Sequence, residues 1–180
     1  MATEEIRLRP LALSDADALF EAARESIQEI HPWMEWCHPD YKREESVGWL
    51  EFQAAARAQG TELTYAIVDR DDRFLGTCSL NQINRAHNFA NLGYWLRTSA
   101  TGRGVAVEAV RRLREIAFNE NRFTRVEIVC AIGNVRSQRV AERAGALREG
   151  VLRNRLTLHG QPVDAVMFSL IRLAADSCGV

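Results

Sequence analysis

The segment from residue 98 to residue 104, Thr-Ser-Ala-Thr-Gly-Arg-Gly, most constrains how this chain of 180 residues folds. It lies between a run typical of a β-strand, residues 88–96, and a run with helical periodicity that begins at Val105. A strand that passes through a glycine turn into a helix leaves backbone N–H groups exposed at the helix start, where the helix dipole favours an anion. A plain strand–helix turn has the same composition, so the segment alone does not establish a phosphate site.

Two familiar phosphate loops do not match this segment. In the dinucleotide-binding pattern a third glycine would stand at Val107, and a βαβ unit would open the chain. In the Walker pattern a Gly-Lys-Ser/Thr sequence would close the loop, but the segment contains no lysine. Any phosphate site here therefore belongs to another fold.

The first sixty residues alternate between strand and helix patterns. Ser14 is a candidate N-cap, with Asp17 three residues later in the capping-box position, and Pro32 ends the apolar stripe that follows. The expected elements are a strand over 6–11, a helix from Ser14 to residue 31, an aromatic loop over 31–40 and a helix over 42–58 ended by Gly60.

The remaining residues predict a sheet with two further helices. The expected strands are 64–68, 74–80, 88–96, 124–131, 147–157 and 163–170. Residues 69–73 and the His159-Gly160 pair have hairpin chemistry. The expected helices start at Val105 and at Asn134, and Gly145 closes the second. These elements predict a mixed α/β (α+β) fold, which we expect to be a single domain over residues 1–180 with a frayed tail from residue 174.

Charge and cysteine usage narrow the class of protein. There are 23 basic and 24 acidic residues, so no overall field favours nucleic acid or an anionic membrane. The N-terminus is charged rather than apolar, and no stretch approaches the ~18 apolar residues of a membrane span. The four cysteines, without a C-x-x-C pair, indicate buried thiols and no metal site; they are Cys37, Cys78, Cys130 and Cys178. We expect a cytoplasmic protein without nucleic-acid or membrane partners.

Three motifs share an order and spacing with one family. Residues 93–96 read Gly-Tyr-Trp-Leu, the glycine segment continues to Ala106, and Asn134-Val-Arg-Ser137 follows the next strand. Together they resemble the GNAT acetyltransferases over residues 6–170, and most closely the ribosomal-protein-serine and ribosomal-protein-alanine enzymes. The resemblance implies a twisted, mostly antiparallel sheet with a V-shaped split, helices on both faces, and acetyl-CoA entering the cleft. Relatives are often dimers, and an edge strand over 163–170 could pair two copies.

The resemblance also assigns the cofactor site. Backbone groups near Leu96, where the strand splays from its neighbour at a bulge, would polarise the thioester carbonyl. Asn134 would bind the pantetheine arm, and Ser137 would protonate or hydrogen-bond the leaving thiolate, although both residues are also good helix caps. The family usually has Gln or Arg where this chain has Thr101. The cofactor-binding residues expected are Leu96, Gly102, Arg103, Gly104, Val105, Ala106, Asn134 and Ser137, with Arg139 and Arg143 as further candidates or solvated helix residues.

The acceptor side is less determined by the sequence. The resemblance places Trp33 and Trp36 over the acceptor groove and Asn81 and Tyr94 beside it, although aromatic residues here could also seal the core. The spacing of His31, Cys37 and His38 fits no common zinc pattern, so no metal is expected.

No residue is an obvious general base. Asn91 and Leu156 stand where relatives have carboxylates, which leaves Asp164, Glu35, Glu127 or water. An α-amine of pKa ~7.8 is roughly 15% neutral at pH 7, against about 0.04% for a lysine side chain. A site without a strong base therefore favours an N-terminal amine.

The main hypothesis is direct transfer of the acetyl group from acetyl-CoA to a primary amine, the α-amine of a protein such as a ribosomal protein. Cys130 is then a core residue and not a nucleophile. A small amine, such as a polyamine, an amino acid or an aminoglycoside, would need an acidic groove, and the acidic stretches at 44–45 and 69–72 are typical of solvated segments. A non-catalytic CoA-binding module on the same fold is the third hypothesis.

Overall fold

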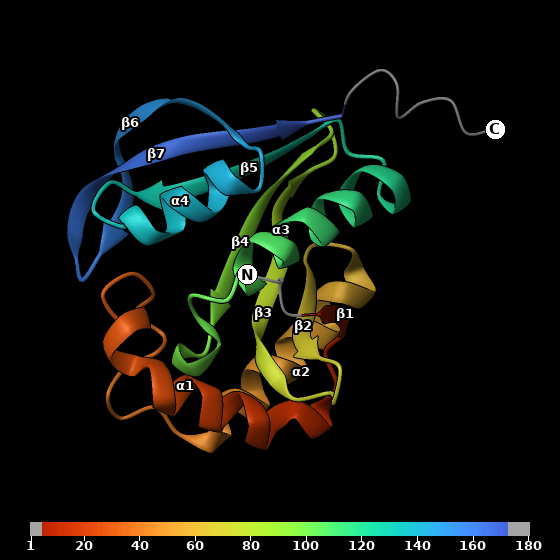
Figure 1. The fold of residues 1–180 in the computed structure, drawn as a ribbon, viewed down its shortest axis with the longest axis vertical. Helices are drawn as coiled ribbons and strands as arrows, with labels where there is room; N and C mark the ends of the chain where they lie inside the picture. Colours follow the sequence, from red (N-terminus) through yellow and green to blue (C-terminus); the bar gives the residue numbers. More distant parts are fainter. Residues whose placement is uncertain (1–4, 173–180) are drawn as a thin grey trace.

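One seven-stranded sheet runs through the protein, in the order β1-β2-β3-β4-β5-β7-β6 (Figure 1). A computed structural model describes residues 5–172. All neighbouring strands are antiparallel except the parallel pair β4 and β5. The strands are β1 (Ile6–Pro10), β2 (Leu63–Asp69), β3 (Phe74–Asn84), β4 (Phe89–Leu96), β5 (Arg125–Ala131), β6 (Leu147–Leu158) and β7 (Gln161–Ile171).

Helices cover both faces of this sheet, as predicted. They are α1 (Ala16–Ile30), α2 (Arg43–Gln59), α3 (Val105–Glu115), which continues as a π turn over Ile116–Glu120, and α4 (Val135–Arg143). The two faces bury two separate cores, and successive residues of β2 alternate between them. Ile67 packs on the α3 side, whereas Ala66 and Val68 pack on the side of α1 and α2. This double burial explains why β2 is apolar on both faces.

The sheet splits between β4 and β5, which confirms the predicted V. The two strands pair only from Phe89–Asn91 to Arg125–Glu127, and beyond that point they diverge (Figure 1). A Cβ atom on Gly76 of β3 would lie 2.1 Å from the Trp95 carbonyl oxygen, so β3 presses against β4 beside the split. The register irregularity of this strand pair lies farther along, between Asn81 and Asn84 of β3. Backbone groups of β4 from Gly93 onward are thus released from β5.

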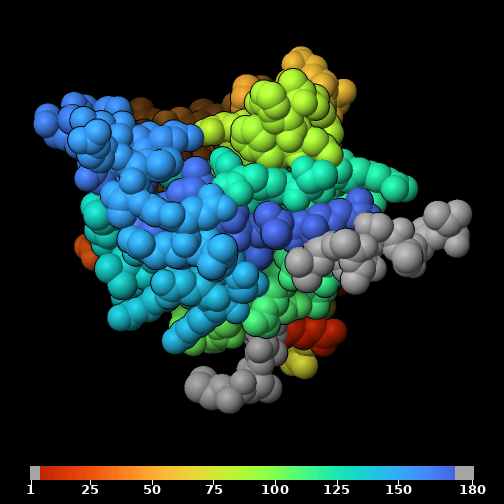
Figure 2. All heavy atoms as spheres, turned by 90° about the horizontal axis from the view of Figure 1, so that it is seen from above, coloured from red at the N-terminus to blue at the C-terminus, as the bar shows by residue number. Residues whose placement is uncertain are grey.

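The edge strand is β6 and not β7, so the expectation that residues 163–170 lie at an edge was wrong. β7 pairs with β5 on one side and with β6 on the other. The β6–β7 hairpin folds back so that its first strand is outermost, a placement that no local pattern encodes. In Figure 2 the blue residues, which include β6, cover much of the face seen from above.

The start of α1 also differs from the prediction. A 3₁₀ turn over Leu13–Asp15 precedes the helix, and the carboxylate of Asp15, rather than Ser14, accepts a hydrogen bond from the Ala12 N–H at 2.8 Å. Asp15 is also ion-paired with Arg9 at 2.7 Å. The positive charge of Arg9 on β1 therefore holds the Asp15 carboxylate at the helix start, where the sequence predicts Ser14.

The cysteines behave as predicted within the described residues. Cys37, Cys78 and Cys130 are buried free thiols, and Cys178 and the tail from residue 174 lie outside the described range. Burial raises the pKa of Cys37 to about 11, so this thiol stays protonated at neutral pH. No helix between residues 5 and 172 has the length and apolar character needed to span a bilayer.

Candidate functional site

A cleft of about 440 Å³ opens at the split, within the range of about 300–1,000 Å³ typical of ligand pockets. We call it the cofactor cleft. Its lining comes from the end of β4, the glycine loop, the first turn of α3, α4 and the loop between α1 and α2. Of the residues predicted to bind the cofactor, it brings together Leu96, Gly102, Gly104, Val105, Ala106, Asn134 and Ser137.

The glycine loop has the backbone geometry that phosphate binding needs. Gly102 and Gly104 adopt φ values of 77° and 81°, which side chains disfavour. No side chain caps the start of α3, so its first N–H groups are left for an anion. Thr101, the departure from the family pattern, also lines the cleft, and its hydroxyl donates to the Thr98 carbonyl at 2.8 Å.

Glu25 of α1 holds this loop in place. Its carboxylate accepts hydrogen bonds from Arg97 Nε at 2.9 Å and from the Ser99 N–H at 2.6 Å. Burial alone would raise the pKa of Glu25, but the hydrogen bonds from Arg97 and Ser99 lower it to about 2. The carboxylate is therefore ionised at neutral pH and fixes the segment that leads into the glycines.

The positive charge of the cleft comes from α4. Arg136, Arg139 and Arg143 line it, and Glu29 is the single carboxylate among its lining residues. Arg103, which the sequence suggested, does not line the cleft, and its guanidinium donates to the Ser99 carbonyl. Arg136 was missed, although its spacing to Arg139 and Arg143 on one helix was a usable signal. Three guanidinium groups beside a glycine loop favour a polyphosphate.

Four side chains form a hydrogen-bonded network beyond the loop. The amide oxygen of Asn134 accepts from the Ser137 N–H at 3.1 Å, so Asn134 does cap α4, and its amide nitrogen remains a donor. The Ser137 hydroxyl lies 2.9 Å from the Tyr94 hydroxyl and 3.1 Å from Cys130 Sγ. The Tyr94 hydroxyl also donates to the Ser137 carbonyl at 3.0 Å.

Two groups of this network stay protonated at neutral pH. Burial raises the pKa of Tyr94 well above its usual range, the neighbouring Cys130 adds to this, and the hydrogen bond to Ser137 opposes it. Burial likewise raises the pKa of Cys130, against the opposing effect of Ser137. Cys130 is therefore a poor nucleophile. The hydroxyl-bearing residues Ser137 and Tyr94 both line the cleft.

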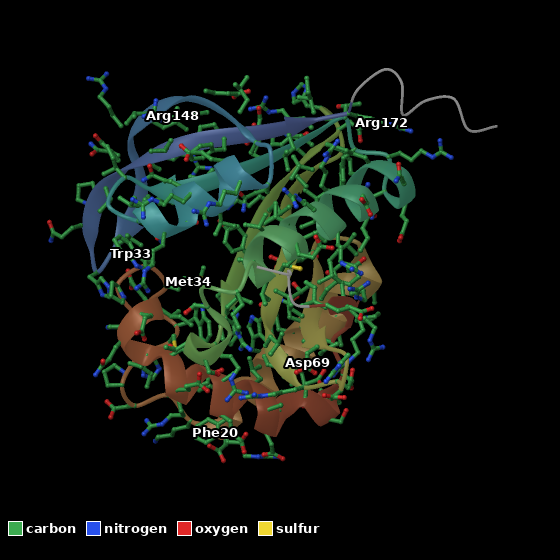
Figure 3. All side chains as sticks on the ribbon, viewed as in Figure 1. Phe20, Trp33, Met34, Asp69, Arg148 and Arg172 are labelled. Carbon is green, nitrogen blue, oxygen red and sulfur yellow. The ribbon has the colours of Figure 1, made fainter. Side chains whose placement is uncertain are left out.

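A second cavity of about 470 Å³, the acceptor pocket, lies against the other face of β4. It shares Met34, Tyr94 and Trp95 with the cofactor cleft, so the two spaces meet at β4. Figure 3 shows Met34 on the α1–α2 loop, at the side of the opening between the two halves of the sheet. The two spaces therefore border the same strand.

Aromatic residues wall the acceptor pocket. Trp36 packs edge-on against Trp95 at 5.3 Å and against Tyr41 at 5.5 Å, measured between ring centroids. Trp49 of α2 also lines the pocket. Of the two tryptophans predicted to bind the substrate, Trp36 lines this pocket and Trp33 lines the cofactor cleft.

The floor of the acceptor pocket is a polar stretch of sheet. Asn91 donates to Asn81 at 2.8 Å, and Asn81 donates to Ser79 at 2.9 Å. A Cβ atom on Gly93 would lie 3.4 Å from the Asn81 amide nitrogen, at van der Waals contact, so Gly93 faces this polar stretch. Asn81 and Tyr94 both line this pocket, as the substrate assignment requires.

The sequence did not predict that two carboxylates, those of Glu45 and Glu62, line the acceptor pocket. Glu45 accepts from the Lys42 N–H at 2.8 Å and is paired with His38 at 3.0 Å. Glu62 accepts from the Thr64 hydroxyl at 3.1 Å. Both line the pocket, although Glu45 resembles a solvated helix start in the sequence.

The α1–α2 loop is clasped to the C-terminal half of the sheet. The His31 and His159 rings meet edge to face at 4.7 Å, and Glu35 accepts a hydrogen bond from the His159 N–H. A Cβ atom on Gly133 would lie 3.3 Å from the Trp33 ring, so glycine permits this contact. Figure 3 shows Trp33 beneath the β6–β7 hairpin.

The three candidate bases have other partners. Asp164 accepts from the Asn154 N–H at 2.8 Å, Glu35 accepts from the His159 N–H, and Glu127 accepts from Arg125 at 2.8 Å. None of the three lines the cofactor cleft or the acceptor pocket. Over residues 5–172, no three His, Cys, Asp or Glu side chains gather closely enough to suggest a metal site.

Comparison with known proteins gives a consistent result. The family model for the acetyltransferase (GNAT) domain matches residues 5–147. YdaF of Bacillus subtilis (strain 168), provisionally named a ribosomal N-acetyltransferase, is 31% identical over 94% of this chain and 92% of its own. A Vibrio cholerae structure, provisionally described as a ribosomal-protein-serine acetyltransferase, has 28% identity and a TM-score of 0.83 over 95% of this chain and 96% of its own. The microcin C7 self-immunity acetyltransferase MccE, in complex with acetyl-CoA and AMP, has 26% identity and a TM-score of 0.87 over 93% of both chains.

Proposed function

Because this chain belongs to the GNAT acetyltransferase family, we propose that it transfers the acetyl group of acetyl-CoA to the N-terminal α-amine of a protein. The observation that carries the proposal is the meeting of two spaces at β4. One has a glycine loop and three arginines, the other is an aromatic pocket, and both reach Tyr94 and Trp95. This arrangement suits a two-substrate reaction in which the acceptor attacks the bound thioester directly.

The cofactor cleft fits acetyl-CoA residue by residue. The N–H groups after Gly102 and Gly104 bind the pyrophosphate, and the arginines of α4 neutralise its charge. The amide nitrogen of Asn134 holds the pantetheine arm. Acetyl-CoA supplies an acetyl group activated as a thioester.

The chain then assists a direct attack. The neutral amine forms the new N–C bond, and backbone N–H groups of β4 near Leu96, released from β5, stabilise the oxyanion. As the C–S bond breaks, the Ser137 hydroxyl donates to the departing thiolate. The Tyr94 hydroxyl donates to the Ser137 carbonyl and lies beside the Ser137 hydroxyl, so Tyr94 orients Ser137 by hydrogen bonding and keeps its own proton. The ammonium proton leaves through water.

The α-amine is the favoured acceptor for two reasons. At pH 7 it offers a neutral fraction about 300-fold larger than a lysine side chain does. Asp164, Glu35 and Glu127 line neither space, and the acceptor-pocket carboxylates Glu45 and Glu62 accept hydrogen bonds from Lys42 and Thr64, so an amine that deprotonates readily suits this site. The relatives with ribosomal names support a ribosomal protein as acceptor.

The proposal includes the setting of the enzyme. We propose one domain over residues 1–180 that works in the cytoplasm, where ribosomal proteins are made, without direct contact with nucleic acid or membrane. A homodimer would use β6, because this edge strand exposes Leu147 and Val151, with 70% and 42% of their surfaces accessible.

A second candidate function is acetylation of a small amine such as a polyamine. One observation favours it: Glu45 and Glu62 make the acceptor pocket acidic. A purely CoA-binding role is disfavoured by the network of Ser137 and Tyr94, because binding alone does not require a hydroxyl donor at the thiol.

Thiol release from acetyl-CoA tests the proposal. The panel contains peptides with free α-amines, the same peptides blocked at the N-terminus but carrying lysine, and polyamines and aminoglycosides. We expect turnover with the free α-amines. Turnover restricted to small amines would replace the proposal by the second candidate, and acetyl-CoA binding without any turnover would support the binding module.

A further inference from the structure

We propose that the acceptor pocket selects α-amine acceptors that carry a second positive charge about 14 Å from the reacting nitrogen, such as proteins with Lys or Arg at the second or third position. This inference rests on the proposed function and names its substrate class. It is carried by the charge, the geometry and the aromatic walls of the pocket.

The two spaces that meet at β4 have opposite charge. The cofactor cleft is lined by three arginines and one glutamate. The acceptor pocket is lined by Glu45 and Glu62, and none of its lining residues is Lys or Arg. Hydrogen bonds from the Lys42 N–H and from His38 lower the pKa of Glu45, which is thus ionised at neutral pH. A cation is attracted to this pocket, and an anion is repelled from it.

The strand register fixes how far apart the two ends of the acceptor lie. Gly93 of β4 pairs with Ser79 of β3, and Ser79 pairs with Thr64 of β2, whose hydroxyl donates to Glu62. Two strand spacings of about 4.8 Å separate Gly93 from Thr64, and Leu96, where the thioester carbonyl is bound, lies three residues farther along β4, so Glu62 is about 14 Å from the reacting centre. Two residues of extended chain span roughly 7 Å, and the long stem of a Lys or Arg side chain covers most of the remainder. A basic side chain near the N-terminus therefore reaches Glu62 while the α-amine stays at β4.

The walls between these points suit a basic side chain. Trp36, Trp49 and Trp95 line the pocket together with Tyr41. Faces of such rings attract Lys and Arg cations, and their surfaces cover the apolar stems of these side chains. An aromatic wall beside a carboxylate thus recognises both parts of the side chain.

A purine would also stack on aromatic walls, and MccE was solved with AMP. The acceptor pocket is nevertheless a poor place for a phosphate, because its lining carboxylates would face the anion without a compensating Lys or Arg. The charge therefore favours a basic acceptor over a nucleotide.

Glu62 is the residue to change. Glu45 also fixes the start of α2 through Lys42, so its replacement would disturb the helix. Glu62→Gln keeps an oxygen that can accept from Thr64 and removes only the charge. Glu44→Gln, at an exposed position of α2 outside the pocket, is the matched control.

The experiment measures kcat/KM for peptides that differ only in having Lys, Arg, Gln or Glu at position two or three, with spermidine as a small polyamine acceptor and AMP as a competitor. We expect the Lys and Arg peptides to exceed the Gln peptide by roughly fivefold and the Glu peptide to be slowest. Glu62→Gln brings the Lys-to-Gln ratio close to one, Glu44→Gln leaves it as in the wild type, and added salt reduces it.

The outcomes separate this inference from the proposed function. Equal turnover of all four peptides would overturn the charge selectivity and leave N-terminal acetylation standing. Turnover of neither the peptides nor spermidine would overturn both, whereas turnover of spermidine alone would retain the selectivity for cations but remove the protein acceptor. Inhibition by AMP that competes with the peptide would place an anion in the pocket and contradict the inference.

Discussion

Replacing Tyr94 by Phe tests how the thiolate is stabilised. The Tyr94 hydroxyl donates to the Ser137 carbonyl at 3.0 Å and lies 2.9 Å from the Ser137 hydroxyl. Because the one proton of the Tyr94 hydroxyl is donated to the Ser137 carbonyl, its contribution acts through Ser137 and not by proton transfer to the thiolate. The account therefore makes Tyr94 a positioning residue.

The magnitudes follow from the contacts. Removing the hydroxyl that meets the thiolate, in Ser137→Ala, should lower kcat about 100-fold, as for the loss of one donor to a developing anion. Tyr94→Phe removes one orienting hydrogen bond worth about 1 kcal/mol, or about fivefold in kcat. Since Tyr94 acts through Ser137, the double variant should be no slower than Ser137→Ala alone.

The assay is steady-state thiol release with saturating acetyl-CoA and peptide, with thermal unfolding as a check on folding. Cys130→Ala is the matched control, because it removes the other partner of Ser137, a weak thiol donor at 3.1 Å, and should change kcat less than about twofold. A double variant about 500-fold slower than the wild type would show that the two effects multiply. That result would refute the reasoning and give Tyr94 a role of its own at the thioester.

Three further predictions concern the cofactor cleft and its support. Gly104→Ala, at φ 81°, should weaken acetyl-CoA binding about tenfold by calorimetry, while Gly60→Ala, at φ 68° far from the cleft, should destabilise the fold without changing that affinity. Arg139→Ala should raise the Kd for acetyl-CoA and reduce its salt dependence, since one charge-assisted contact is lost. Glu25, with a folded pKa of about 2 against ~4.3 unfolded, contributes stability above pH 4.3 that is lost as the pH falls toward 2. Urea unfolding should therefore show that Glu25→Gln removes about 1–2 kcal/mol at pH 7 and much less at pH 2.5.

Most elements of the fold could be predicted because their signals are local. The helical stripe from Val105, the glycine turn and the hairpin at His159 each depend on residues close in sequence. The order of the strands could not, because β7 takes its place between β5 and β6 through pairing with segments far along the chain. The cap of α1 was missed for a similar reason, since Arg9 of β1 recruits Asp15.

The residues of the candidate site likewise fall into those that local motifs predict and those that only the tertiary structure brings together. The glycine loop and the pair of Asn134 and Ser137 lie within short motifs, so the sequence located them. Arg103 was expected at the cleft because it lies between the glycines, but its guanidinium turns to the Ser99 carbonyl. Glu45 and Glu62 lie seventeen residues apart, at the start of α2 and just before β2, and only the packing of α2 over the sheet brings both carboxylates into one pocket.

The most direct test of the central claim locates the acetyl group on the product. The enzyme is incubated with acetyl-CoA and a peptide that has both a free N-terminal amine and an internal lysine, and fragmentation by mass spectrometry shows which nitrogen is modified. The account predicts one acetyl group on the α-nitrogen, strongly reduced in Ser137→Ala. An acetyl group on the lysine side chain, or an unmodified peptide, would contradict it.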